Sequence, residues 1–127
     1  MKIFYTSSVD HLKKFNEGKF RVNKLPDGEI LVKVLEEVRG QKVGVVANIS
    51  PPAENFFEMA FLVDALKRGG AKVVLFLTYL SYARQDKIRE EGEALSIEVI
   101  CNFIKSFRLD KIIILHGHSS EIKKYLN

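Results

Sequence analysis

The sequence has little cysteine: Cys101 is the only one among 127 residues. A single thiol can form neither an internal disulfide bond nor the multi-thiolate cluster of a structural zinc site, so both kinds of scaffold are excluded. Cys101 falls on the predicted apolar face of a helix, which indicates a small core residue rather than a reactive group.

Long hydrophobic runs are also missing. No apolar stretch is long enough to cross a bilayer, and the apolar part of the N-terminal MKIFYTSS is too brief for a secretory signal. We therefore expect no membrane partner and a cytoplasmic location. The 46% hydrophobic content suffices for one core, and the length is typical of one domain, so we expect residues 1–127 to form a single domain.

No basic block accompanies the net charge of +4 and the pI near 9.2. Lysines and glutamates are interspersed along the chain, as on an ordinary solvated surface, and no basic stripe alternates with aromatic residues. We expect no nucleic-acid partner. The glycine-rich Walker loop and the G-x-G-x-x-G fingerprint are absent as well, so neither common nucleotide-binding motif applies.

What the chain does contain is an alternation of apolar β-branched runs with segments of helical period. A PDG turn between two alternating runs predicts an antiparallel pair of strands. The predicted strands cover residues 2–7, 19–25, 29–35, 42–49, 72–80 and 111–118. The predicted helices cover residues 9–18, 54–71, 96–109 and a last segment that begins at 119, with Gly18 ending the first and Ser96 as the N-cap of the third.

This order predicts right-handed crossovers and a parallel sheet between helices, that is, an α/β domain. Ligands of such sheets bind at the carboxyl ends of the strands. The loops expected there are SPPAEN, SYARQDKIREEGEALS and HGHSS, at residues 50–55, 81–96 and 116–120. The second is longer than a structural connection requires, which favours a binding loop.

Four polar residues in the long loop are candidates for binding a phosphorylated ligand. Arg84 and Lys87 could contact phosphates, Gln85 could contact a base or sugar edge, and Asp86 could orient Arg84. The same residues could equally form a solvated turn with a surface ion pair of little energetic value.

His116 and His118 lie two apart at a strand end, where they could bind a metal or a metal-bound phosphate, act as acid or base, or belong to a plain polar loop. In LPDGEI, turn chemistry alone explains Asp27 and Gly28, whereas Glu29 is less explained by the turn and is a further candidate.

Four segments carry a resemblance to a known family. They are LPDGEILVKVLEEVRG, PPAENFFEMAFLVDALKRGGAK, YARQDK and GEALSIEV. In this order and spacing they resemble the N-terminal half of ribose-phosphate pyrophosphokinase, most closely its archaeal-type members. The resemblance implies a phosphoribosyltransferase-like three-layer sandwich with a mainly parallel sheet and a short antiparallel flap.

The family enzyme transfers diphosphate from ATP to ribose 5-phosphate with the help of magnesium. The resemblance therefore implies that Arg84 and Gln85 contact ATP and that His118 helps to hold magnesium. Asp27 and Glu29 would lie in a flap that reaches the ATP bound by a neighbouring subunit. A homo-oligomer is accordingly expected.

Three departures from the family pattern are visible: Leu25 occupies the place of an aromatic residue before the D-G-E turn, His116 that of an acid, and residues 78–82 (TYLSY) that of the family's P-Y-F-G-Y. The ribose 5-phosphate-binding second half has no counterpart here. Two hypotheses follow. The chain is the ATP-side half of the enzyme, inactive alone and in need of a separate C-terminal half, or it is an inactive paralogue that serves as a regulatory or assembly subunit of an active one.

Overall fold

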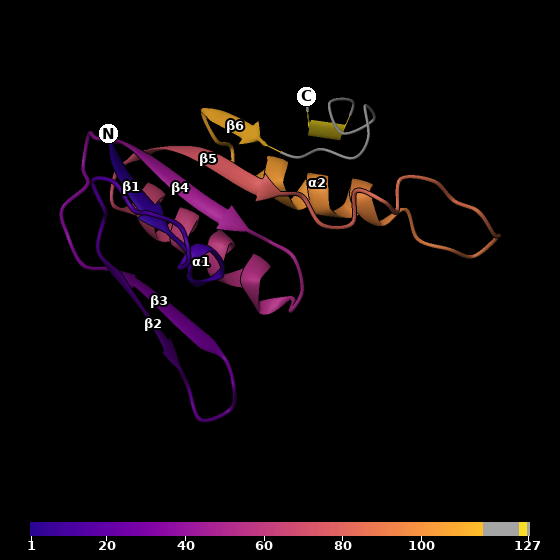
Figure 1. The fold of residues 1–127 in the computed structure, drawn as a ribbon, viewed down its shortest axis with the longest axis horizontal. Coiled ribbons are helices and arrows are strands. Elements are labelled where there is room, and N and C mark those ends of the chain that lie inside the picture. Colours follow the sequence, from indigo (N-terminus) through magenta and orange to yellow (C-terminus); the bar gives the residue numbers. More distant parts are fainter. Residues whose placement is uncertain (116–124, 127) are drawn as a thin grey trace.

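The computed structural model describes residues 1–115 and 125–126 (Figure 1). Its strands are β1 (Lys2–Tyr5), β2 (Phe20–Lys24), β3 (Ile30–Val34), β4 (Lys42–Asn48), β5 (Lys72–Tyr79) and β6 (Lys111–Ile114). Its helices are the short 3-10 turn η1 (Ser7–Val9) and the α-helices α1 (Glu54–Arg68) and α2 (Ser96–Ser106). The predicted helix that begins at 119 lies outside the described residues, apart from 125–126.

The main sheet has four strands in the order β1-β4-β5-β6, and every neighbouring pair is parallel. Alternate residues of β4 and β5, such as Val45 and Leu75, join one buried cluster with the apolar sides of α1 and α2. Both helices therefore cover the same face of the sheet, as two right-handed crossovers in one direction require. The predicted α/β class, with a mainly parallel sheet and a small antiparallel flap, is confirmed.

The two long helices form as their apolar periodicity predicts. Met59, Leu62, Val63 and Leu66 are buried along α1, while Ile97, Cys101 and Ile104 are buried along α2. The C-terminus of α1 is closed by a Schellman motif, in which Ala71 N–H donates to Leu66 O and Gly70 N–H donates to Lys67 O, both at 3.0 Å. Gly70 has the left-handed conformation that this cap requires, with φ of +90°.

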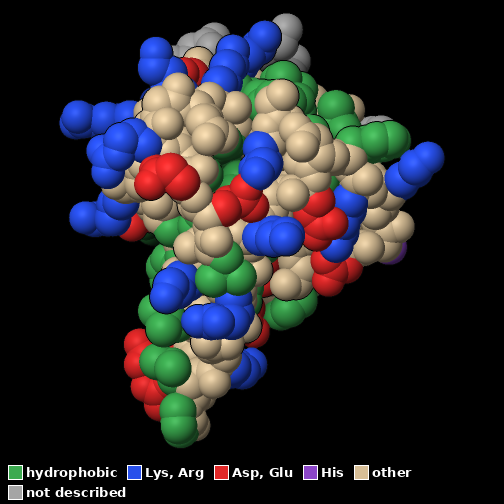
Figure 2. Space-filling model, turned by 90° about the vertical axis from the view of Figure 1, so that its left-hand side faces the viewer, with side chains coloured by type: hydrophobic (Ala, Val, Ile, Leu, Met, Phe, Trp, Pro, Cys, Tyr) green, Lys and Arg blue, Asp and Glu red, His purple; other side chains and the backbone are tan. Residues whose placement is uncertain are grey.

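Strands β2 and β3 form the predicted flap, an antiparallel pair that projects below α1 in Figure 1. Its apolar residues alternate, so that Phe20, Val32 and Val34 turn to the core while Arg21 and Lys33 point to solvent. Figure 2 shows the flap projecting from the molecule, with exposed hydrophobic side chains between charged ones. Charges of both signs are interspersed on this face, as the sequence indicated.

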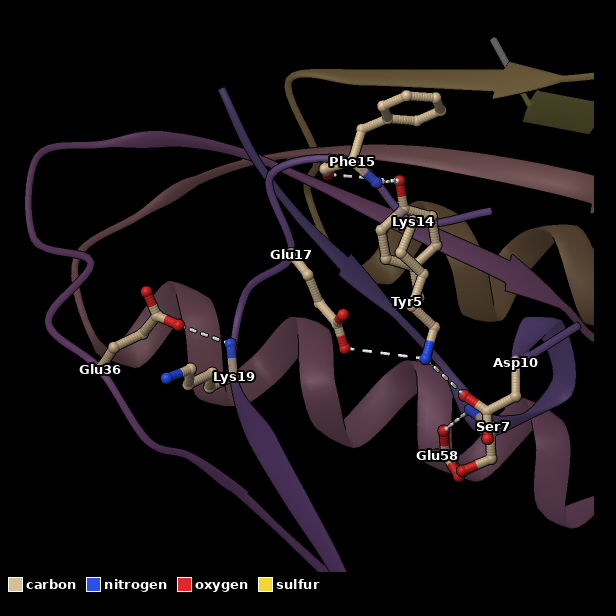
Figure 3. A network of polar contacts seen from close by, with 9 residues as sticks. All are labelled: Tyr5, Ser7, Asp10, Lys14, Phe15, Glu17, Lys19, Glu36 and Glu58. Carbon is tan, nitrogen blue, oxygen red and sulfur yellow. Dashed lines mark hydrogen bonds and ion pairs between the residues drawn. The ribbon is translucent and has the colours of Figure 1, made fainter. Parts of the chain in front are cut away.

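The helix predicted over residues 9–18 is wrong. Only the turn η1 forms, and residues 16–18 run beside β1, where Gly18 N–H donates to Ile3 O at 2.7 Å. Gly18 is required by a close approach to β1: a Cβ there would lie 2.5 Å from Cζ of Phe4. The Tyr5 hydroxyl accepts a hydrogen bond from Phe15 N–H at 3.0 Å, which also fixes this segment (Figure 3). These contacts stabilise the non-helical conformation more than the local apolar periodicity stabilises a helix.

Two smaller expectations concern α2. The predicted N-cap Ser96 is wrong, because the cap position is Leu95, which makes no side-chain capping bond, and Ser96 is already helical. Cys101 is buried as expected, and burial raises the pKa of its thiol to about 11.

In the described part of the chain, no helix is both long and apolar enough to span a bilayer.

Candidate functional site

The carboxyl ends of β1 and β4 are joined by short polar side chains. The hydroxyls of Thr6 and Ser8 lie 2.9 Å apart, and Ser8 Oγ accepts a hydrogen bond from Asn48 N–H at 3.1 Å. Asn48 Oδ1 in turn accepts from Ser50 N–H at 2.9 Å. The segments that follow β1 and β4 are therefore fixed relative to each other by bonds to main-chain atoms.

A buried carboxylate of α1 contacts the segment that follows β1. Glu58 of α1 is only 7% exposed, and its Oε2 accepts a hydrogen bond from Ser7 N–H at 2.6 Å (Figure 3). A buried carboxylate costs free energy unless it is hydrogen-bonded, so this contact ties the start of η1 to α1. Glu58 was not among the residues predicted from the sequence. The available signal was an acidic residue directly beside Met59 of the apolar stripe.

The long loop begins with an anchor in the core. Leu80 and Ala83 are at most 1% exposed, and the buried Ser81 hydroxyl donates to Ile49 O at 2.7 Å. This bond connects the loop after β5 to the loop after β4. Ser81 was likewise missed, since nothing in the sequence pairs it with a residue 32 positions away.

The first residues of the loop turn sharply out of the core. Tyr82 has a left-handed conformation with φ of +68°, and Gln85 N–H donates to Tyr82 O at 2.9 Å. Gln85 O accepts from Ile97 N–H in the first turn of α2 at 3.3 Å. The backbone of Arg84 and Gln85 is thus held on both sides, by the buried Ala83 and by α2.

The side chains of Arg84 and Gln85 are exposed and, among the described residues, neither makes a hydrogen bond or an ion pair. The expected pair between Asp86 and Arg84 is also absent from this part of the chain, so Asp86 does not orient Arg84 here. A fixed backbone that presents a free guanidinium and a free amide to solvent suits a phosphorylated ligand.

The tip of the same loop is closed on itself. Glu93 Oε1 accepts from Arg89 N–H at 2.8 Å and from Glu90 N–H at 2.9 Å. These two backbone bonds lower the pKa of the Glu93 carboxyl. Local hydrogen bonds therefore close this turn, which is exposed to solvent.

The flap tip is a three-residue hairpin loop, in which Leu25 N–H donates to Glu29 O at 2.7 Å and Gly28 N–H donates to Leu25 O at 2.9 Å. Gly28 supplies the left-handed position with φ of +94°. Asp27 Oδ1 accepts from Glu29 N–H at 2.9 Å. When Glu29 is protonated it can hydrogen-bond to the Asp27 carboxylate, which lowers the pKa of Asp27 and raises the pKa of Glu29.

The predicted site residues fall into two separate groups. Asp27 and Glu29 lie between β2 and β3 at the far end of the flap, whereas Arg84 and Gln85 lie after β5, next to the N-terminal end of α2 (Figure 1). The structure does not bring the groups together within one chain. His116 and His118 lie outside the described residues.

Magnesium finds no ready-made protein site in what the structure describes. Within residues 1–115 and 125–126, no three side chains among His, Cys, Asp and Glu are grouped so as to hold a metal ion. The described residues therefore do not fit a metal held by protein ligands alone.

The family can be decided from comparison with known proteins. Residues 5–107 match the family described as the N-terminal domain of ribose phosphate pyrophosphokinase. The chain therefore belongs to the ribose-phosphate pyrophosphokinase family. The match includes the flap, α1, the long loop and all of α2, which are the segments that carried the resemblance.

Individual relatives agree with this assignment. The chain is 31% identical to the ribose-phosphate pyrophosphokinase of Buchnera aphidicola from Acyrthosiphon pisum over all of its length, but over 44% of that protein. It is 33% identical to that of Nitrosomonas europaea, with 88% of this chain and 36% of the relative covered. A chloroplastic rice relative is 32% identical over 87% of this chain and 28% of its own length.

The fold has a solved counterpart. The phosphoribosylpyrophosphate synthetase of Mycobacterium smegmatis matches with a TM-score of 0.86 and 26% identity, covering 99% of this chain and 45% of that one. The chain thus spans less than half the length of these relatives. They come from bacteria and a plant, so the expected closeness to archaeal-type members finds no support in them.

Proposed function

We propose that this chain is the ATP-binding half of a ribose-phosphate pyrophosphokinase, which transfers diphosphate from ATP to ribose 5-phosphate. In this proposal Arg84 and Gln85 contact ATP, and turnover needs a C-terminal half that binds ribose 5-phosphate. The proposal is supported by the family membership and by the length of the relatives, which is more than twice the matched part.

One observation carries the proposal: Arg84 and Gln85 have a fixed backbone and side chains without polar partners in the described structure. Binding costs less when the backbone that carries the recognising groups is already held in place, because less conformational entropy is lost. A guanidinium with free N–H groups can form a bidentate bond to phosphate oxygens, which a guanidinium already paired with a carboxylate cannot do as well.

Magnesium would enter this site mainly with the nucleotide. Mg²⁺ is commonly held by substrate phosphates and one or two protein groups rather than by a full protein cage. His118 is the protein group that the family resemblance implies. Asp27 and Glu29 at the flap tip would reach the ATP of a neighbouring copy, which agrees with their separation from Arg84 in one chain (Figure 1).

The test is calorimetric titration of the chain with ATP, with and without magnesium. We expect binding that needs magnesium and that is lost in Arg84→Ala. Arg89→Ala is the matched control, because it removes the same charge from the same loop at another exposed position. Equal losses in both variants would show non-specific attraction to positive charge, and no binding by the unaltered chain would refute the proposal.

A second function, that of an inactive regulatory or assembly subunit, is favoured by a different observation. Leu25 at the flap tip is 40% exposed and offers no aromatic ring for stacking on a base. This hypothesis predicts that ATP does not bind while the chain still associates with an active relative. Mixing the chain with a full-length family enzyme and measuring co-migration and enzyme activity separates it from the first.

A further inference from the structure

The four parallel strands begin at one edge of the sheet, opposite the loop that carries Arg84 (Figure 1). Three segments end at the first residues of β4, β5 and β6, namely 35–42, 67–72 and 105–111. They hold eight of the 20 basic residues of the chain but three of its 16 acidic ones, so their formal charge is +5, compared with +4 for the whole chain. The excess positive charge of the protein therefore lies at this edge.

Hydrogen bonds join the three segments into one surface. Lys72 N–H donates to Gln41 O at 2.8 Å, and Lys67 Nζ donates to Arg108 O at 3.0 Å. Acidic side chains are interspersed over the view in Figure 2, but lysine and arginine predominate in its upper part, where the strands begin. We call this surface the basic edge; its cations are Arg39, Lys42, Lys67, Arg68, Lys72, Lys105, Arg108 and Lys111.

Most cations of the basic edge have no acidic partner. All eight side chains are exposed. Arg68 pairs with Asp64 at 2.8 Å, whereas the other seven make no ion pair with the residues that the structure describes. Their charge is therefore available to an anionic partner.

Three lysines of the basic edge lie where they repel one another. Lys42 and Lys72 are directly opposite in the pairing of β4 and β5, so their side chains leave the same face of the sheet. Lys111 pairs with Val74, two residues beyond Lys72, and shares that face. Like charges on neighbouring strands are destabilising, so the stability of the sheet does not explain this row.

Arg108 is a fourth cation that the fold does not require. It follows the C-cap of α2 in the left-handed conformation, with φ of +53°. The equivalent residue after α1 is Gly70, which adopts the left-handed conformation without strain. An arginine is less stable than a glycine in this conformation. A role for the guanidinium in binding would account for its presence.

The composition of the basic edge distinguishes between classes of partner. Protein interfaces are poor in lysine and rich in aromatic residues, and membrane-surface helices place large apolar side chains beside their cations. Single-stranded nucleic acids bind to exposed aromatic rings. Within the three segments, Leu35 is the one exposed large hydrophobic residue, and no aromatic ring is among those exposed. The phosphate backbone of a duplex needs cations alone.

We infer that the basic edge binds the phosphate backbone of a nucleic-acid duplex, without reading its sequence, through Lys42, Lys72, Lys111 and Arg108. The sequence predicted no nucleic-acid partner because it contains no basic block. The fold forms such a block from three separate segments. This binding goes beyond the proposed function and lies at the other edge of the sheet from Arg84 (Figure 1).

The test is fluorescence anisotropy of a labelled 20-base-pair DNA duplex, titrated with the chain at several salt concentrations between about 50 and 200 mM. Each phosphate contact contributes about −0.9 to the slope of log K against log salt, so four contacts predict a slope of about −3 to −4. A second duplex of unrelated sequence is expected to bind equally well, since phosphate contacts carry no sequence information.

Lys72→Gln removes one of these contacts. It is expected to weaken binding about eightfold at 0.1 M salt and to make the slope shallower by about 1, because one fewer counterion is released. Lys72→Arg keeps the charge and is expected to bind as the unaltered chain does. Lys13→Gln is the matched control. Lys13 is an exposed lysine after η1 that makes no ion pair in the described structure, and its loss is expected to change neither quantity.

Several outcomes would overturn this inference. They are no binding of either duplex at 50 mM salt, an equal loss in Lys13→Gln, and tighter binding of a single strand than of the duplex. Binding of anionic phospholipid vesicles or of polyglutamate in preference to the duplex would assign the basic edge to a membrane or to an acidic protein instead.

The proposed function is tested separately. Arg84→Ala is expected to leave duplex binding unchanged, and Lys72→Gln is expected to leave ATP binding unchanged. Loss of duplex binding in Arg84→Ala would place the duplex at the ATP site and overturn the inference. A chain that binds ATP but no duplex would refute the basic edge alone, whereas one that binds the duplex but no ATP would refute the nucleotide site alone.

Discussion

The flap tip and the start of the long loop are both exposed and both carry candidate binding residues, but they are built differently. At the flap tip, the Asp27 carboxylate accepts a hydrogen bond from Glu29 N–H within the hairpin itself. In the loop, Leu80 and Ser81 are buried in the core, while the exposed Arg84 side chain makes no hydrogen bond or ion pair with the residues that the structure describes. A loop with a buried start and exposed polar side chains can bind a ligand within one chain. A hairpin that projects from the molecule is placed to contact a ligand bound by a neighbouring chain.

The largest expected difference between the two regions is in stability. Leu80→Ala removes a side chain that is 0% exposed at the base of the loop, and we expect the free energy of unfolding to fall by about 2–5 kcal/mol. Leu25→Ala, at the 40% exposed flap tip, is expected to change it by at most about 0.5 kcal/mol. Urea unfolding measures both. Similar losses in the two variants would show that the flap tip is as firmly anchored as the loop.

The hydrogen bond from Ser81 to Ile49 gives a smaller effect. Ser81→Ala leaves a buried carbonyl oxygen without this donor, and we expect a loss of about 1–2 kcal/mol in the free energy of unfolding. Ser106→Ala is the control, because its hydroxyl also donates to a carbonyl, that of Phe103, but at an exposed position. If both variants lose the same amount, burial does not strengthen the Ser81 anchor.

The sequence predicts those parts of the fold that repeat a local pattern. The buried run from Lys42 and the apolar stripe of α1 give β4 and α1 within a few residues, and the PDG turn gives the flap. Each depends on residues that are close in the chain, so periodicity and turn chemistry suffice. The fold class follows from the order of these elements.

Contacts between distant residues account for what the sequence does not predict. Tyr5 and Phe4 hold the segment up to Gly18 out of a helix, and Glu58 meets Ser7 across 51 positions. No local pattern encodes such pairs. The sequence predicts that Arg84 and Gln85 lie on the long loop. It does not predict the hydrogen bond from Ser81 to Ile49 that fixes the start of this loop.

A substitution that strains the backbone of the flap tip is expected to change stability still less than Ser81→Ala does. Gly28 has φ of +94°, and no atom lies within 4 Å of the place that a Cβ would occupy, so Gly28→Ala is opposed by backbone conformation rather than by a clash. We expect a cost of about 1 kcal/mol, seen as faster amide exchange at Leu25, whose N–H closes the hairpin. Gly28→Asn should cost less, because Asn tolerates this conformation better. Unchanged exchange in Gly28→Ala would mean that the tip has another closed conformation.

The smallest effect concerns the two carboxyl groups of the flap tip, both exposed. The hydrogen bond between them lowers the pKa of Asp27 and raises the pKa of Glu29. The contribution of Asp27 to stability is therefore lost as the pH falls through its lowered pKa. That of Glu29 is present at low pH and is lost as the pH rises through its raised pKa, so the two changes oppose each other in acid.

Titration of the side-chain carboxyl carbons by NMR can resolve the pair. We expect Glu29 to titrate above the ordinary glutamate range and Asp27 below the ordinary aspartate range. In Asp27→Ala, the pKa of Glu29 is expected to return toward its usual value, because the partner that stabilises its protonated form is gone. Glu93, whose pKa is lowered by backbone bonds in the long loop, is the internal control and should not move. If the pKa of Glu29 stays raised in this variant, a group other than Asp27 sets it. The polar contacts of the flap tip would then extend beyond its own two carboxyl groups, and the contrast with the long loop would fail.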